Sequence, residues 1–155
     1  RYSFPLQVFF LNKRIKMMKE AAELTNCIMD RSIYGDVIFS RMLMEDGDMT
    51  IEEFNVYEEL LFNMLEHIKK PKLMIYLESS VNHAISQIEK RGRDYELIVP
   101  HSYWESLNAH YRNYFDNYNL SDILKINVDG LDFFNNENDR NYILNLIDDK
   151  INSLT

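Results

Sequence analysis

The sequence predicts an α/β fold, a parallel sheet flanked by helices, and two patterns indicate it. The short apolar runs 26–30, 73–77 and 123–128 have the length of buried strands, and the stretches between them space apolar residues as on one helix face. Strands that alternate with helices are joined by crossovers, which makes them parallel. Only four Gly and three Pro occur, and no linker or repeat is visible, so we expect a single domain over residues 1–155.

The N-terminal part of the chain predicts three helices and the first strand. Over 4–22, apolar residues recur at helical spacing and form one stripe. The run 26–30 ends in a carboxylate and is typical of a buried strand. The stretch 36–44 predicts the second helix. Thr50 and Glu53 have the spacing of a capping box, so we expect a third helix to begin there.

The middle of the chain predicts a strand followed by a helix. The run 73–77 is continuously apolar, as expected of a strand covered on both faces. Ser79 or Ser80 is a suitable cap for the helix that follows, and Gly92 is a suitable end.

The last third of the chain predicts a helix, a strand and a final helix. Ser102 and Glu105 have the spacing of a second capping box. The third strand is 123–128, and apolar residues at helical spacing predict a helix over 137–154.

The composition excludes several classes of protein. Hydrophobic residues make up 46% of the chain, which argues against a disordered tail. No apolar run approaches the ~18–20 residues that cross a bilayer, so we expect no membrane association. A net charge of −8 repels phosphates, and we expect no nucleic-acid partner. The single cysteine, Cys27, lies in a predicted strand, which favours a core side chain and a reducing, cytoplasmic environment.

The first candidate for chemistry is the pair Asp30-Arg31, which follows the first predicted strand. An acid and a guanidinium side by side can hold a cation and an anion together, which suits a phosphate that shares charge with a metal. The alternative interpretation is a salt bridge that fixes the turn after the strand.

The second candidate is the segment in which Arg91 and Arg93 flank Gly92, with Glu96 three residues after the second Arg. Mobile Arg residues can close over a transferring phosphoryl group and stabilise its charge. The alternative is a helix C-terminus at which cations offset the helix dipole.

The third candidate is Gln7 with Arg14. They are seven residues apart, nearly two helical turns, so both point the same way from the edge of the apolar stripe. An amide and a guanidinium there can read the polar rim of a flat ligand such as a nucleobase. The alternative is an exposed helix shoulder.

Other familiar motifs are missing from the 155 residues. The four His lack metal-ligand spacing, and a paired CxxC does not occur. The phosphate-cradling loop GxxxxGK followed by Ser or Thr does not occur either.

In order along the chain, these motifs resemble those of the deoxynucleoside kinase family. They are Gln7 with Arg14 on a helix, Asp30-Arg31-Ser32, Arg91-Gly92-Arg93 with Glu96, and Asp132-Phe133. The stretches DRSIYGD and KRGRDYE are most similar to the bacterial deoxyadenosine/deoxyguanosine kinases, and the resemblance covers essentially the whole chain. It implies a three-layer P-loop kinase fold. It also implies transfer of the γ-phosphoryl group of ATP to the 5′-hydroxyl of a deoxynucleoside, with Mg²⁺, in nucleotide salvage.

The resemblance implies a base-binding end. There Gln7 pairs with the base edge, Arg14 and Asp36 meet its far side, and Phe39 stacks on it. Because an Asp accepts from an exocyclic amine and an Arg donates to a ring nitrogen or carbonyl, this end fits a purine or cytosine better than thymine. We expect deoxyadenosine first, then deoxyguanosine or deoxycytidine.

The resemblance also implies a phosphate end. Arg31 holds the 5′ end and its incoming phosphate, with Asp30 near the metal. Arg91 and Arg93 are lid residues over the phosphates, and Glu96 binds the sugar 3′-hydroxyl.

The remaining implications concern the phosphate donor and the departures from the family. Asp132 and Phe133 lie by the adenine of ATP. The family's first strand, P-loop and general-base carboxylate precede the Gln-bearing helix and are not in this chain. A lid position that is often Arg in the family is Gln87 here, so either the lid compensates less of the phosphate charge or another cation takes over. We expect a polypeptide that begins at Arg1 to be inactive and its full-length parent to be active.

Two other functions fit the same residues. A nucleoside-binding module would keep Gln7, Arg14 and Asp36 but catalyse nothing. A nucleoside monophosphate kinase of thymidylate-kinase type shares the fold and an Arg-bearing lid, but an Asp placed for a base amine argues against it. The family resemblance further implies a homodimer formed through helices, for which 4–22 and 50–68 carry broad apolar faces.

Overall fold

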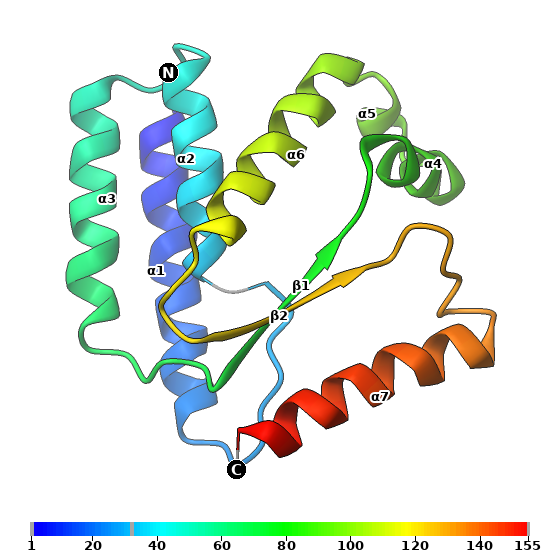
Figure 1. The fold of residues 1–155 in the computed structure, drawn as a ribbon. Coiled ribbons are helices and arrows are strands. Elements are labelled where there is room, and N and C mark those ends of the chain that lie inside the picture. The colour runs from blue at the N-terminus through cyan, green and yellow to red at the C-terminus, as the bar shows by residue number, and fades with distance from the viewer. Residues whose placement is uncertain (1, 32, 155) are drawn as a thin grey trace. The chain divides into compact units, whose positions relative to one another are not determined.

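A computed structural model describes residues 2–31 and 33–154 of the chain. The chain forms two compact units, Arg1–Lys70 and Pro71–Thr155 (Figure 1). The described residues of the first unit are helical or irregular, and the second unit holds a sheet.

The first unit is a group of helices that contact one another around an apolar core. Its elements are α1 (Ser3–Ala22), the short 3₁₀ helix η1 (Ile33–Gly35), α2 (Asp36–Glu45) and α3 (Ile51–Leu65). The predicted stripe of α1 is buried at Leu11, Ile15 and Met18, and α3 contributes Phe54, Tyr57 and Leu61. The three predicted helices of this part are therefore confirmed.

The predicted capping box at the start of α3 is also confirmed. The Thr50 hydroxyl accepts from the Glu53 amide at 3.2 Å, and the Glu53 carboxylate accepts from the Thr50 amide at 2.9 Å. Two amides that the helix leaves without intrahelical partners are thus satisfied reciprocally.

The predicted strand 26–30 is wrong. These residues are irregular, Ile28 is 95% exposed, and Cys27 is an exposed free thiol rather than a core side chain. An isolated extended segment gains no ladder hydrogen bonds, and in the described part of the chain 26–30 pairs with no other strand. An apolar run therefore stays irregular when no neighbouring strand is present to pair with it.

The second unit is built around two parallel strands. Its elements are β1 (Leu73–Glu78), α4 (Val81–Arg91), α5 (Asp94–Leu97), α6 (His101–Asp116), β2 (Asp122–Asn127) and α7 (Glu137–Ser153). The register pairs Leu73 with Asp122 and Glu78 with Asn127. The predicted strands 73–77 and 123–128 and their parallel arrangement are confirmed.

The two faces of this sheet are covered unequally. On one face, Tyr76 stacks on Phe115 of α6, with ring centroids 4.3 Å apart. On the other, Ile126 and Ile143 form a core between β2 and α7. The expectation that 73–77 is covered on both faces is wrong for this second face, because α7 lies against β2 and leaves Leu77 of β1 46% exposed.

The helix ends of the second unit agree with the sequence in one place and differ in another. Ser80 caps α4 by accepting from the His83 amide at 3.2 Å, and Gly92 ends it with φ +67°, a left-handed conformation that glycine adopts without strain. The predicted capping box at Ser102 is wrong. The helix α6 begins one residue earlier, directly after Pro100, so Ser102 is already inside its first turn.

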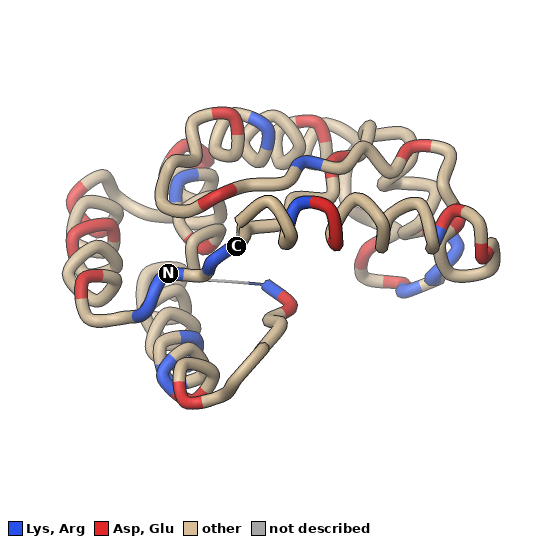
Figure 2. Tube along the Cα trace, turned by 60° about the horizontal axis from the view of Figure 1, so that its bottom comes forward, with Lys and Arg blue, Asp and Glu red and all other residues tan. Residues whose placement is uncertain are grey.

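Charge is distributed differently in the two units. In the first unit, residues 42–68 carry acidic residues and no Lys or Arg, whereas acidic and basic residues alternate more closely along the second unit (Figure 2). None of the helices in the described ranges combines the length and apolar character that crossing a bilayer requires.

Candidate active site

A buried ion pair joins α1 to α2 in the first unit. Arg14 Nη1 lies 2.8 Å from Asp36 Oδ1, and the exposed fraction of the Asp36 side chain is 7%. Burial of Leu11 and Ile15 orients α1, so that Arg14 projects from the edge of the buried stripe. Asp36 is the first residue of α2, where the helix dipole favours a negative charge.

The electrostatics of Asp36 leave a buried acceptor ready to bind. Burial raises the pKa of Asp36 to about 6, while the positive charges of Arg14 and Arg31 act to lower it. The carboxylate is therefore mostly ionised at neutral pH. Its second oxygen, Oδ2, is buried and makes no hydrogen bond with any residue in the described ranges. A buried carboxylate oxygen without a donor is costly, so this atom is suited to a ligand that supplies an N–H or O–H.

Two other predicted base-end residues lie on the same helices. Gln7 is half-buried on α1, two turns before Arg14, and Phe39 is half-buried on α2, one turn after Asp36. The structure thus has the predicted amide, guanidinium, carboxylate and ring on two contacting helices of one unit.

Arg31 and Asp30 precede η1 and are both exposed. Arg31 is close enough to Asp36 to act on its pKa, and its φ of +59° is left-handed. A non-glycine residue pays about 1–2 kcal/mol for that conformation. The salt bridge considered above as an alternative is not formed, since no ion pair of the described residues joins Asp30 to Arg31.

The sequence reasoning missed two buried polar residues behind Asp36. Ser40, one turn along α2, is fully buried, and so is Tyr57 of α3, whose hydroxyl faces Ser40. Burial raises the pKa of Tyr57 to about 12, so the hydroxyl stays protonated. The available signal in the sequence is the spacing of Asp36 and Ser40, which lie one turn apart on one helix.

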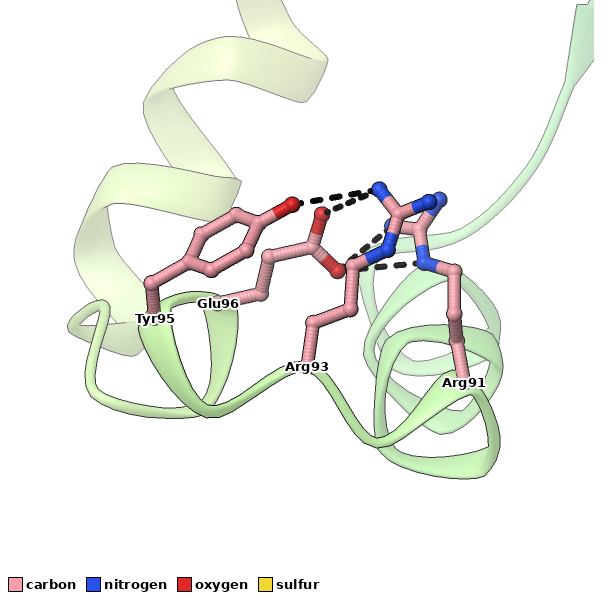
Figure 3. Close-up of polar contacts among 4 residues, drawn as sticks. All are labelled: Arg91, Arg93, Tyr95 and Glu96. Atoms are coloured by element: carbon pink, nitrogen blue, oxygen red, sulfur yellow. Dashed lines mark hydrogen bonds and ion pairs between the residues drawn. The ribbon is translucent and has the colours of Figure 1, made fainter.

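In the second unit, four residues form an exposed arginine cluster, Arg91, Arg93, Tyr95 and Glu96 (Figure 3). Glu96 Oε2 accepts from Arg91 Nη2 at 2.7 Å and from Arg91 Nε at 3.1 Å. Arg93 Nη1 lies 3.5 Å from Glu96 Oε1 and donates to the Tyr95 hydroxyl at 3.2 Å. The turn at Gly92 lets the Arg on each side of it reach the same carboxylate.

The cluster is suited to exchange partners. About half of each Arg side chain is exposed, while Glu96 is 15% exposed. Ion pairs in water contribute about 0–1 kcal/mol, so an anion of higher charge can draw the guanidinium groups away at small cost.

Asp132 and Phe133 lie in the loop between β2 and α7. The Asp132 carboxylate accepts from the Asn135 amide at 3.1 Å and from its side chain at 3.0 Å, and these bonds hold the pKa of Asp132 below its usual value. The Lys90 charge acts in the same direction, so the end of α4 lies near this loop. Phe133 is 41% exposed and free to stack on a flat ligand.

Metal ligands are sparse in the described residues. Three or more His, Cys, Asp or Glu side chains do not gather anywhere in residues 2–31 and 33–154. Mg²⁺ is commonly held by one or two carboxylates and by substrate phosphates, so the exposed carboxylate of Asp30 fits that role.

Comparison with known proteins decides the family. A model of the family described as deoxynucleoside kinase matches residues 1–152. The chain belongs to the deoxynucleoside kinase family. This membership confirms the predicted resemblance and favours the kinase over a non-catalytic binding module and a thymidylate-kinase-like enzyme.

Individual relatives agree. A deoxyguanosine kinase from Lactobacillus johnsonii and a deoxyadenosine kinase from Lactobacillus acidophilus are each 36% identical over 99% of this chain, which covers 73% and 76% of them. A solved structure of the deoxyadenosine kinase from M. mycoides with bound dATP is similar with a TM-score of 0.79. It is 30% identical, and the match covers 95% of this chain and 75% of that one.

These findings confirm the predicted α/β fold of the P-loop kinase type and the predicted ATP-dependent phosphotransferase. They do not show which deoxynucleoside this kinase prefers. The two Lactobacillus enzymes are named for different bases, and both are 36% identical to this chain.

Proposed function

We propose that this deoxynucleoside kinase prefers a deoxynucleoside whose base carries an exocyclic amine, with deoxyadenosine first, then deoxyguanosine or deoxycytidine. The observation that carries the proposal is the buried Asp36 carboxylate, with Oδ1 on Arg14 at 2.8 Å and Oδ2 left to accept. Thymine has no exocyclic amine and presents a carbonyl oxygen where cytosine carries its amine. Placing that oxygen against the buried Oδ2 would bring two acceptors together, and only the ring N3–H of thymine is left to donate.

The residues around Asp36 complete the base end of the proposed site. Arg14 keeps its pair with Asp36 and donates a second N–H to a ring nitrogen or a carbonyl oxygen. Gln7 pairs with the opposite polar edge of the base, and Phe39 stacks on its face. The fixed Arg14–Asp36 pair makes this end rigid, which favours discrimination between bases over tolerance.

The phosphate end is proposed to use exposed cations. Arg31 holds the 5′ end of the acceptor, and Arg91 and Arg93 leave Glu96 to close over the triphosphate. Glu96, released from the two guanidinium groups, accepts from the sugar 3′-hydroxyl. The γ-phosphorus then forms a bond to the 5′-oxygen as its bond to the leaving ADP oxygen breaks. The proton of the 5′-hydroxyl passes to a general base that residues 1–155 do not supply, and the guanidinium groups stabilise the charge on the equatorial oxygens.

The phosphate donor is proposed to bind with its adenine against Phe133 and Asp132. When bound, Mg²⁺ would neutralise the charge of the triphosphate, and Asp30 is the carboxylate of this chain proposed to hold it, indirectly. Asp30 needs no buried position for this, because the phosphates themselves supply most of the ligands.

The proposal is tested by steady-state kcat/KM of the full-length protein encoded by the gene, with ATP and each of the four deoxynucleosides. We expect kcat/KM for deoxyadenosine to exceed that for thymidine by about 100-fold. This ratio corresponds to about 2.7 kcal/mol, the cost of losing the hydrogen bond to one buried acceptor. A preference for thymidine would refute the assignment of Arg14 and Asp36.

We also propose a homodimer formed through α1. Leu6, Phe9, Phe10 and Met17 recur at helical spacing and are 49%, 53%, 43% and 52% exposed, a stripe that a second copy would cover. Light scattering should give twice the chain mass for the wild type and one chain mass for Phe10→Glu. The control Phe134→Glu changes an exposed ring in another segment and should stay dimeric.

Two further features belong to the proposal. The family match spans both compact units, which supports folding of residues 1–155 as one domain. The single exposed thiol of Cys27 supports a cytoplasmic location, because an unpaired surface cysteine suits a reducing compartment.

A further inference from the structure

The junction between β1 and α4 is held by two other parts of the second unit, α6 and the segment after β2. Three consecutive residues make the contacts, Glu78 at the end of β1, then Ser79 and Ser80 before α4. The Ser79 carbonyl accepts from Asn108 Nδ2 of α6 at 2.8 Å. The Ser80 amide donates to Asp129 Oδ1, in the segment after β2, at 2.9 Å.

The contacts of Glu78 complete this arrangement. Its carbonyl accepts from the Val128 amide at 2.9 Å, and its carboxylate lies 3.2 Å from Nε of Arg112, one turn along α6 from Asn108. The junction is therefore fixed from α6 on one side and from the end of β2 on the other. Asn127 in turn holds the Asp129 amide at 2.8 Å, which orients the carboxylate that Ser80 uses.

The position of this junction matters because a small tilt at the start of α4 displaces the far end of the helix by several ångströms. It has 11 residues and carries Arg91 at its far end. At 1.5 Å per residue it is about 16 Å long, so a tilt of about 10° at its base moves that end by about 3 Å. A misplacement of about 1 Å can cost a reaction about 100-fold, so a small error at the base matters at the arginine cluster.

We propose that Asn108 and Asp129 are positioning residues for the phosphoryl transfer. By fixing the first residues of α4, they set the direction in which this helix presents Arg91 and Arg93 to the phosphates. The inference rests on the proposed role of these two Arg residues. It adds a role for two residues that contact neither substrate and lie 29 and 49 residues from their junction partners.

The first test compares Asn108→Ala with Asn113→Ala in the full-length protein. Asn113 lies on the same helix, and its side chain accepts from Asn117 rather than contacting the junction. For Asn108→Ala we expect kcat to fall about tenfold, while the Kd for deoxyadenosine, set mainly by the first unit, changes less than about threefold. Asn113→Ala should leave both values within about twofold of the wild type.

The second test uses conservative rescue at Asp129. Asp129→Asn keeps an oxygen that can accept from the Ser80 amide, whereas Asp129→Ala does not. We expect Asp129→Ala to lower kcat about tenfold and Asp129→Asn to retain at least half of the wild-type value. Thermal unfolding of each variant distinguishes a reoriented α4 from a destabilised fold. If only the direction of α4 has changed, the loss of kcat should persist well below Tm.

The outcomes separate this inference from the proposed function. A kcat for Asn108→Ala and Asp129→Ala equal to that of Asn113→Ala, in an active enzyme, would overturn the positioning role alone. A parallel loss of deoxyadenosine binding and kcat would also overturn it, because general destabilisation predicts that pattern. A wild type without deoxynucleoside kinase activity would overturn both.

Discussion

The two compact units use the same chemical pair, an arginine and a carboxylate, in opposite ways. In the first unit Arg14 and Asp36 are paired at 2.8 Å with the carboxylate buried. In the second, Arg91 and Arg93 share Glu96 with their own side chains about half exposed. A buried pair is costly to break because each partner leaves an uncompensated charge, whereas an exposed pair separates readily. The first arrangement suits recognition of a fixed base, and the second suits cations that must move onto phosphates.

Removing the buried carboxylate should have the largest effect. We expect Asp36→Ala to lower kcat/KM for deoxyadenosine about 1000-fold and the free energy of unfolding by about 3 kcal/mol, because Arg14 is left partly buried without its partner. Steady-state kinetics and denaturant unfolding measure the two effects. Asp46→Ala, at the exposed end of the same helix, is the control and should change neither by much.

Removing an exposed arginine should lower kcat strongly and the free energy of unfolding only slightly. For Arg91→Ala we expect kcat to fall about 100-fold, as when one donor to a charged transition state is lost. The free energy of unfolding should change by less than about 1 kcal/mol, because half of the Arg91 side chain is exposed and Arg93 still pairs with Glu96. Arg140→Ala, on α7, serves as control. A loss of stability as large as that of Asp36→Ala would show that the contrast between the pairs is wrong.

Acidification should act on the buried pair first. The pKa of Asp36 is raised by burial to about 6, and only the ionised carboxylate accepts at both oxygens. We expect kcat/KM for deoxyadenosine to fall about tenfold per pH unit below that value. Asp36→Asn should abolish this dependence in its residual activity; an unchanged acid limb in that variant would assign the titration to another group.

The same pKa has the opposite effect on stability. The folded-state pKa of Asp36 lies above its ordinary value of 3.8, so the folded chain binds this proton more tightly than the unfolded chain. The contribution of Asp36 to the free energy of unfolding therefore rises as the pH falls from about 6 toward 4. Comparing denaturant unfolding of the wild type and Asp36→Asn over this range isolates that contribution.

The smallest effect should come from the edge of the exposed cluster. Tyr95→Phe removes the hydroxyl that accepts from Arg93 at 3.2 Å. Because Tyr95 is 64% exposed and the bond competes with water, we expect kcat to change by about twofold and Tm hardly at all. Tyr142→Phe on α7 is the control. A tenfold loss would mean that the cluster is held rigidly rather than ready to exchange partners.

The sequence predicts elements whose signals are local. Helical spacing identifies α1 and α7, and the Thr50–Glu53 pair marks the start of α3, because these signals depend on residues three or four apart. The segment 26–30 shows the limit, since an apolar run becomes a strand only beside a partner that no local pattern supplies. At Ser102 a correct spacing was overridden by Pro100.

The residues of the candidate site also differ in how far they could be predicted from local sequence. Arg91, Arg93 and Glu96 lie within six residues, and their convergence follows from the turn at Gly92. The Arg14–Asp36 pair joins two helices, and from the sequence it was implied only by the family resemblance. Asp129 is visible in the sequence as a carboxylate just after the third predicted strand, but the roles of Asn108 and Asp129 could not be predicted, because they arise from contacts with distant residues of the junction.

A crystal structure of the full-length enzyme with deoxyadenosine bound tests the central claim most directly. We predict that Asp36 Oδ2 accepts from the exocyclic amine at about 2.8–3.2 Å while Oδ1 keeps its bond to Arg14. An adenine bound away from Asp36, or an Arg14–Asp36 pair that separates to admit it, would contradict the account.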